Sequence, residues 1–184
     1  MLSDTPPERD IEWTESGVEG AWRFIQRLWR LVHEAIAQGE TGEPSGATGE
    51  ALALRRAAHK ALAAVTGDLS ALRFNRAIAR VYELANALTP ALQSADKPPE
   101  LRRAIREAAE LMVLMSAPMM PHLAEECWSE LGHQVAVVDT PWPTPDAALI
   151  AEDEVTIAVQ VNGKRRDEVR LAKGLEKSEV VLSC

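Results

Sequence analysis

Apolar residues recur at steps of three and four through most of the first 131 positions, and this spacing restricts the possible folds more than any other feature. On an α-helix, residues with this spacing share one face, which is buried against another element. The amphipathic stretches are residues 16–38, 50–72, 74–89, 98–116 and 121–131. Their apolar faces include Val18, near the start of the first stretch, and Leu72, at the end of the second.

Composition supports the same conclusion. Alanine, which carries the smallest helix penalty, occurs 29 times, whereas Tyr occurs once and Phe twice. Because each stretch has one apolar face and the connections are short, the sequence predicts a mainly α protein built as an antiparallel helical bundle.

Local signals predict where several of these elements begin and end. Ser16 and Glu19 have the spacing of a capping box at the start of the first helix. The third helix should stop before Pro90, because an internal proline removes a helical hydrogen bond. The valine-rich stretch 135–138 predicts a short strand.

The pattern changes to period two near the end of the chain. The alternating apolar residues are Val155, Ile157, Val159 and Val161, followed by Asn162-Gly163 and then Val169 and Leu171. Asn-Gly favours a type I′ turn, so this is a β-hairpin. A lone hairpin is marginally stable, and only 13 residues follow Leu171. We therefore expect a helical domain (1–138), a Pro-rich linker (139–153) and the beginning of a truncated α+β domain (154–184).

The formal charge of −8 is distributed unevenly. The total argues against a general nucleic-acid binder, which is normally basic. Residues 20–106, however, carry 13 basic and eight acidic groups, whereas residues 107–153 carry nine acidic groups and no basic one. A basic region flanked by acidic ones can direct a polyanion onto one face.

The sequence offers no catalytic residue and no metal site. It contains neither G-x-x-x-x-G-K nor G-x-G-x-x-G, and its two cysteines can form neither a disulfide framework nor a structural zinc site alone. His122, Glu125 and Glu126 form the nearest thing to a ligand cluster, but a second spaced histidine is missing. We expect His122 to lie at a helix start and both glutamates to face water. Without an apolar run of roughly 18 residues or a signal peptide, a cytoplasmic location is expected.

Arginines provide the candidate binding residues. They form three helical rows and one run of three cations: Arg23, Arg27 and Arg30; Arg73, Arg76 and Arg80; Arg102, Arg103 and Arg106; and Lys164, Arg165 and Arg166 at the hairpin turn. Guanidinium groups bind phosphates well, so an RNA-backbone face is one interpretation. The other is solvated rows neutralised by helical ion pairs, such as Arg80 with Glu83. The row from Arg73 to Arg80 has only that one acidic partner, and the hairpin cations can equally protect a strand edge.

Aromatic and methionine residues also allow two interpretations. Trp22 and Trp29 are two helical turns apart and could stack nucleic-acid bases, although packing against neighbouring helices is the simpler expectation. Met112, Met115, Met119 and Met120 are expected to fill the core rather than form a ligand surface. Cys127, on an apolar stripe, is expected to be buried.

Several longer segments resemble bacterial leucyl-tRNA synthetases, in the order found in that family. They are DTPPERDIEW (Asp4–Trp13), SGVEGAWRFIQRLWRLV (Ser16–Val32), RFNRAI (Arg73–Ile78), APMMPHLAEECW (Ala117–Trp128), the pair Trp142-Pro143, and VQVNGKRRDEV (Val159–Val169). The related valyl and isoleucyl enzymes share a looser form of the fourth segment but not SGVEGA or VNGK.

The resemblance implies a fragment of such an enzyme: its anticodon-binding-type helical domain, of class I synthetases, and the start of its small tRNA-binding domain. The family's ATP-site signatures, H-I-G-H and K-M-S-K-S, are absent from this sequence, as is the editing domain. The implied role is therefore to hold the body of tRNA(Leu), with no catalytic group and no cofactor in the fragment.

The intact enzyme would use ATP and Mg to attach leucine to tRNA. The implied partners are tRNA(Leu) and the missing catalytic and editing domains of the same chain, and the protein is expected to be monomeric. On this basis Arg73, Arg76, Arg80, Lys164, Arg165 and Arg166 are the leading tRNA-binding candidates, with Arg23, Arg27 and Arg30 as weaker ones. The alternative function is a stand-alone helical scaffold that binds a protein partner through its Met and Trp surface.

Overall fold

The computed structural model describes residues 14–39, 42, 46–151, 154–161 and 164–172, the last two ranges by their backbone alone. The chain divides into two compact units, Met1–Leu149 and Ile150–Cys184, which are considered separately.

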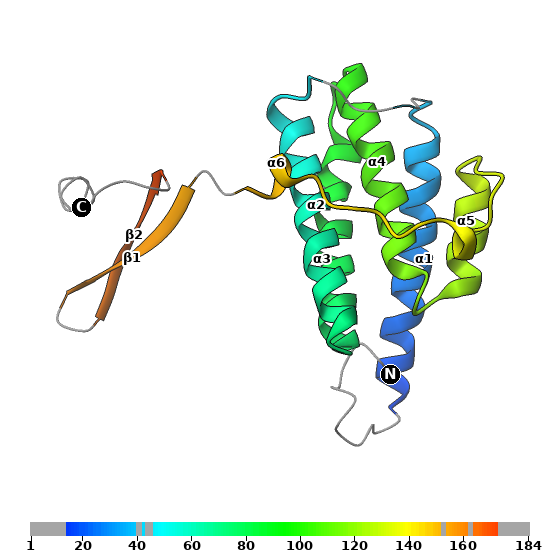
Figure 1. The fold of residues 1–184 in the computed structure, drawn as a ribbon, viewed down its shortest axis with the longest axis horizontal. Coiled ribbons are helices and arrows are strands. Elements are labelled where there is room, and N and C mark those ends of the chain that lie inside the picture. Colours follow the sequence, from blue (N-terminus) through cyan, green and yellow to red (C-terminus); the bar gives the residue numbers. More distant parts are fainter. Residues whose placement is uncertain (1–13, 40–41, 43–45, 152–153, 162–163, 173–184) are drawn as a thin grey trace. The chain divides into compact units, whose positions relative to one another are not determined.

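The first unit is a bundle of helices that run in alternate directions, from α1 in blue to α4 in green (Figure 1). Its elements are α1 (Glu15–Ile36), α2 (Gly49–Ser70), α3 (Phe74–Gln93), α4 (Pro99–Ser116), α5 (Pro121–Glu130) and the 3₁₀ helix η1 (Val137–Asp139), followed by α6 (Ala147–Ile150) at the boundary of the units. The predicted mainly α bundle is confirmed. The segment between η1 and α6 crosses the bundle and reaches α2 (Figure 1).

Helix α4 lies at the centre of this bundle and contacts α1, α2, α3 and α5. Its last six residues before Ala117 are all buried. The largest fully buried side chains of the core are Leu28, Leu31, Leu62, Leu84, Leu88, Ile105, Met112 and Met115. Apolar faces from four helices therefore close around one core, as the three-and-four spacing requires.

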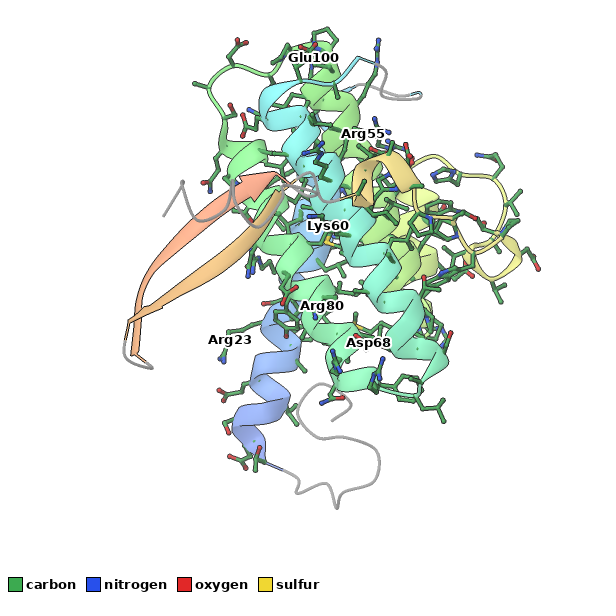
Figure 2. All side chains as sticks on the ribbon, turned by 60° about the vertical axis from the view of Figure 1, so that its left-hand side comes forward. Arg23, Arg55, Lys60, Asp68, Arg80 and Glu100 are labelled. Atoms are coloured by element: carbon green, nitrogen blue, oxygen red, sulfur yellow. The ribbon has the colours of Figure 1, made fainter. Side chains whose placement is uncertain are left out.

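The sequence predicts that Val18 and Leu72 belong to buried apolar faces, and both predictions are wrong. Val18 is exposed, because the first turns of α1 extend past the ends of the other helices (Figures 1 and 2). Leu72 is 62% exposed because α2 ends at Ser70. Leu72 has a φ of 56°, in the left-handed region, so its side chain leaves the line of the helix face.

The start of α1 and the end of α3 also differ from the sequence-based predictions. Helix α1 is capped by Thr14, whose Oγ1 accepts a hydrogen bond from the backbone N–H of Gly17 at 3.2 Å, rather than by the Ser16–Glu19 pair. Helix α3 continues through Pro90 to Gln93. Burial of Ala91 and Leu92 against the core holds this last turn, which offsets the one hydrogen bond lost at the proline.

The predicted strand at 135–138 is wrong: Val137 and Val138 begin η1, and the two residues before them belong to no helix or strand. The backbone N–H groups of Val137 and Val138 donate to the two carboxylate oxygens of Glu125, at 2.8 and 3.1 Å. Glu125 therefore accepts hydrogen bonds from the N–H groups that have no partner within η1, and it does not simply face water. A side chain from α5, twelve residues away, decides this local conformation.

Arg27 connects α1 to α3. Its guanidinium donates to Asn86 Oδ1 at 2.8 Å, Thr89 Oγ1 at 2.9 Å and the Ala85 carbonyl at 3.1 Å. These three acceptors lie along one face of α3, so this one side chain joins α1 to α3, as the stacked rings of Phe24 and Tyr82 also do.

The second unit contains β1 (Glu154–Val161) and β2 (Lys164–Ala172), paired antiparallel. Val155 is opposite Leu171 and Ile157 is opposite Val169, so the alternating apolar positions pair with each other. The register shifts between Val159 and Gln160. The predicted Asn162-Gly163 turn lies outside the described residues.

Replacing Arg27 with Met should lower the free energy of unfolding by about 2 kcal/mol, because three hydrogen bonds from a charged donor are lost, two of them partly buried. Arg30→Met is the matched control on the same helix, because Arg30 is exposed and its Nε lies 3.6 Å from the carboxylate of Glu34. That change should cost less than about 0.5 kcal/mol. Urea unfolding measures both, and equal effects would show that Arg27 does not join the helices.

Cys127 should be chemically inert in the folded chain. It is fully buried in α5, and burial, with smaller contributions from Glu126 and Glu130, raises the pKa of its thiol to about 11. At pH 8 only about one thiol in a thousand is ionised, so disulfide exchange should be very slow. A Cys184→Ser variant, treated with a chromogenic disulfide reagent, isolates the response of Cys127. Rapid labelling before denaturant is added would contradict its burial.

Candidate nucleic-acid interface

The turn between α2 and α3 brings acidic and basic side chains together at one end of the bundle. Leu72 reverses the chain with its left-handed φ, and the backbone N–H of Arg73 donates to the carbonyl of Asp68 at 2.8 Å. This short connection places the last turn of α2 beside the first turns of α3. Arg73 and Arg76, three residues apart, consequently both reach Asp68.

Asp68, labelled in Figure 2, is the carboxylate that two arginines of this cluster share. Its side chain is buried, and Arg73 Nε lies 2.8 Å and Arg76 Nε 3.6 Å from its Oδ1. A buried carboxylate requires a countercharge, and here it has two. The expectation that this row has only Glu83 as an acidic partner is therefore wrong. Counting pairs within one helix could not reveal Asp68, because it belongs to the preceding helix.

Arg80 forms the ion pair that the sequence predicts. Its Nη1 donates to both carboxylate oxygens of Glu83, at 2.9 and 3.1 Å. The hydrogen bond and charge of Glu83, together with the more distant charge of Asp68, raise the pKa of Arg80 above its ordinary value. Arg80 is therefore charged at any physiological pH.

The three arginines and two carboxylates leave this cluster with one net positive charge. The side chains of Arg73 and Arg76 are about half exposed, at 46% and 54%. Asp68 is contacted through the Nε atoms, whereas the two Nη atoms of each guanidinium carry the other four N–H donors. An arginine held at Nε by a carboxylate has a fixed plane and can present its Nη donors to a phosphate.

The row on α1 does not form a comparable face. Arg23 and Arg30 are exposed and lie 3.6 Å from Glu19 and Glu34, respectively. Arg27 is turned toward α3 and holds the two helices together. Three cations on one helical face are thus divided between solvent and an interhelical contact.

The remaining candidates have different outcomes. Lys164, Arg165 and Arg166 begin β2, and their side chains lie outside the described part of the chain. Trp29 packs against the core and the His33 ring, whereas Trp22 is 58% exposed, so its predicted packing is wrong. Met112 and Met115 are fully buried, and Met119 and Met120 pack against the core, as predicted.

Neither a metal site nor a membrane span is found in the described residues. Within 14–39, 42 and 46–151, no three His, Cys, Asp or Glu side chains are grouped so that they could hold a metal ion. None of the described helices combines the length and the apolar character needed to cross a membrane.

Comparisons with known proteins agree with this architecture. Residues 52–182 match the family model of the anticodon-binding domain of tRNA ligase. Leucine–tRNA ligases from Parvibaculum lavamentivorans and Agrobacterium fabrum are 55% and 50% identical to this chain, over 98% of it but only 21% of each relative. These relatives confirm the resemblance to leucyl-tRNA synthetases, and the chain spans about a fifth of their length.

A solved structure is also similar. The crystal structure of the ternary LeuRS–tRNA–LeuAMS complex from Agrobacterium radiobacter superimposes with a TM-score of 0.81 and 25% identity, covering 98% of this chain and 24% of that one. Three observations therefore point to the same family: the helical bundle, the match of residues 52–182 to the family model, and the similarity to this solved structure. The chain belongs to the family of anticodon-binding domains of tRNA ligases.

Proposed function

We propose that this chain is the tRNA-docking part of a leucine–tRNA ligase. The observation that carries the proposal is the 50–55% identity to leucine–tRNA ligases over 98% of the chain. The described residues offer no grouped set of metal-binding side chains, and the sequence has no ATP-site signature. Because the chain spans only about a fifth of these relatives, activation of leucine with ATP and Mg, and its transfer to tRNA(Leu), would belong to other parts of such a ligase.

The cluster of Arg73, Arg76 and Arg80 is the proposed contact with the tRNA backbone. Phosphate contacts dominate the affinity of such interfaces and require cations whose donors can reach outward. Asp68 supports this role by holding Arg73 and Arg76 at Nε, so that less side-chain entropy is lost when a phosphate binds. A surface arginine without such a support would bind a phosphate less well.

The second unit supplies a further contact. We assign residues 1–138 to the helical docking domain, 139–153 to the connection and 154–184 to the beginning of the small tRNA-binding domain. Lys164, Arg165 and Arg166 would bind the tRNA backbone there. The complete enzyme would act as a cytoplasmic monomer, with the catalytic and editing domains supplied by the same polypeptide.

Neutralising the cluster should weaken tRNA binding. A chain carrying Arg76→Gln and Arg80→Gln should bind tRNA(Leu) about tenfold more weakly, because each charge-assisted hydrogen bond contributes roughly 1.5–3 kcal/mol before competing losses. The slope of log affinity against log salt should also fall by about one for each phosphate contact removed. Glutamine is preferable to glutamate, because a second carboxylate beside the buried Asp68 would destabilise the fold.

The matched control is Arg30→Gln, which removes one exposed arginine of a similar ion pair from α1. Filter binding at several salt concentrations measures all three chains, and their melting temperatures confirm that they are folded. In an intact ligase the double variant should raise the KM for tRNA and leave leucine-dependent ATP–pyrophosphate exchange unchanged. Binding equal to that of the Arg30 control would exclude these arginines from the interface.

A further inference from the structure

One apolar stripe of α1 is only partly covered. Its members recur at steps of three, four and seven: Val18, Trp22, Ile25, Trp29 and Ile36. Trp29 and Ile36 pack against the core, and the centroids of the Trp29 and His33 rings are 4.3 Å apart. Ile25 is half-buried, whereas Val18 is 42% and Trp22 58% exposed. The stripe is therefore packed along the later turns of α1 and uncovered along the first turns.

The length of α5 limits how much of α1 it can cover. Helix α1 has 22 residues and α5 has 10, which correspond to about 33 Å and about 15 Å at about 1.5 Å per residue. The two helices are in contact, and α5 lies beside the later turns of α1 (Figure 1). Because Val18 and Trp22 remain exposed, no part of the described chain continues the line of α5 along the first turns.

The uncovered end of the stripe is separate from the solvent face of α1. That face is a polar row whose members are all exposed: Glu15, Glu19, Arg23, Gln26, Arg30 and Glu34. A helix that already has one polar face is normally buried along its apolar ones. Large apolar side chains that are exposed together beside such a polar rim are typical of an interaction site. Val18, Trp22 and Ile25 therefore fit a contact with another surface.

The neighbouring charges favour a polypeptide over a nucleic acid. Glu15 and Glu19 precede Val18 and Trp22 by three residues, so each carboxylate is a neighbour of an exposed apolar side chain on the helix surface. Arg23, which lies 3.6 Å from Glu19, offsets only one of the two charges. A base stacked on Trp22 would bring its phosphates toward this net negative charge. An apolar surface with lysine or arginine at its edge is complementary instead.

We propose that Val18, Trp22 and Ile25 are the seat of an amphipathic helix from another part of the same ligase. Such a helix buries its apolar face on the stripe and continues the cover that α5 provides. The chain spans about a fifth of the related leucine–tRNA ligases, so most of such a polypeptide lies outside it. This inference rests on the proposed function only in that the chain is part of a ligase.

Hydroxyl-radical footprinting, read by mass spectrometry, tests the seat through the reactivity of single tryptophan rings. In the isolated chain, Trp22 should be oxidised faster than Trp128, in the ratio of their exposed fractions of 58% and 6%. In an intact ligase that contains this chain, the ratio should fall to about one, because the core of an interface is packed like a protein interior. Addition of tRNA(Leu) to the isolated chain should leave the rate at Trp22 unchanged.

Val18→Gln and Val138→Gln make the same change at two exposed valines, of which only Val18 belongs to the stripe. Neither substitution should alter the melting temperature of the isolated chain, because both side chains already contact water. In the intact ligase, Val18→Gln should raise the reactivity of Trp22 several-fold, because a buried amide without a hydrogen-bond partner weakens the contact. Val138→Gln should leave that reactivity unchanged.

A Trp22 ring that stays reactive in the intact ligase would overturn the proposal, as would equal effects of the two substitutions. Slow oxidation of Trp22 in the isolated chain would place its cover within residues 1–184, and protection by added tRNA would make it a base-stacking residue; either result also contradicts the proposal. The protection of Trp22 in the ligase is measured without tRNA. A chain that fails to bind tRNA would therefore overturn the proposed function and not this inference.

Discussion

The burial of α4 is the constraint on which the rest of the structure depends. Eleven of its eighteen residues are buried, and it contacts each of the other four long helices. Its last turns, from Leu111 to Ser116, are buried all round, and the Ser116 hydroxyl is satisfied by the Met112 carbonyl at 2.7 Å. A helix surrounded in this way requires its neighbours to supply complementary apolar faces, and this fixes their packing.

The same burial forces the acidic side chains near the core to find partners on other elements. Glu107 is bound by Arg55 and His59 from α2. Glu110 is bound by Arg106 of its own helix and by His133 from beyond α5, whose ring stacks on Trp128. Asp68 is bound by Arg73 and Arg76. Each of these carboxylates would be costly to bury alone, so each one links two parts of the chain. The proposed tRNA contact depends on such a link at Asp68, and the attachment of Asp146 to α2 depends on one at Glu107.

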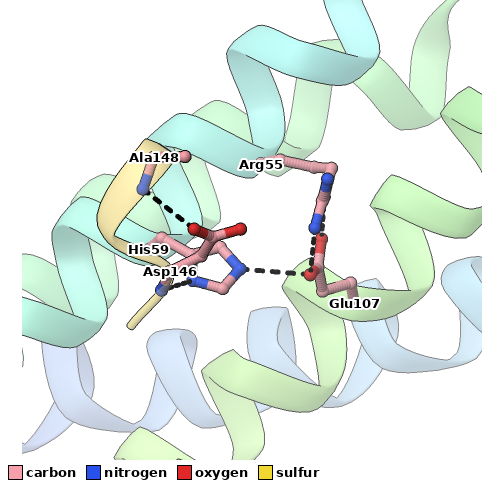
Figure 3. A network of polar contacts seen from close by, with 5 residues as sticks. All are labelled: Arg55, His59, Glu107, Asp146 and Ala148. Atoms are coloured by element: carbon pink, nitrogen blue, oxygen red, sulfur yellow. Dashed lines mark hydrogen bonds and ion pairs between the residues drawn. The ribbon is translucent and has the colours of Figure 1, made fainter. Parts of the chain in front are cut away.

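This arrangement connects stability to function. Asp68 neutralises part of the charge of the arginine row, yet it also orients Arg73 and Arg76 at the end of the bundle. Glu107 Oε1 lies 3.1 Å from His59 Nε2, and the other ring nitrogen, Nδ1, accepts a hydrogen bond from the backbone N–H of Asp146 (Figure 3). In both cases a buried or half-buried carboxylate on one helix orients side chains of a neighbouring element, so a substitution there should affect more than folding.

The sequence by itself determined the helical bundle, most of its core and the alternation of the hairpin, because periodicity reflects which face of an element is buried. It also determined the relation to leucyl-tRNA synthetases and the arginines that could meet a phosphate. Only the tertiary structure decided that Val18 and Leu72 are exposed, that Glu125 turns residues 137–139 into a 3₁₀ helix, and that Arg27 joins two helices. It alone paired Asp68 with Arg73 and Arg76, and His59 with Asp146, 87 residues away. Such contacts depend on how the helices pack and on where the chain turns. A local sequence pattern therefore cannot predict which residue of another element will be the partner.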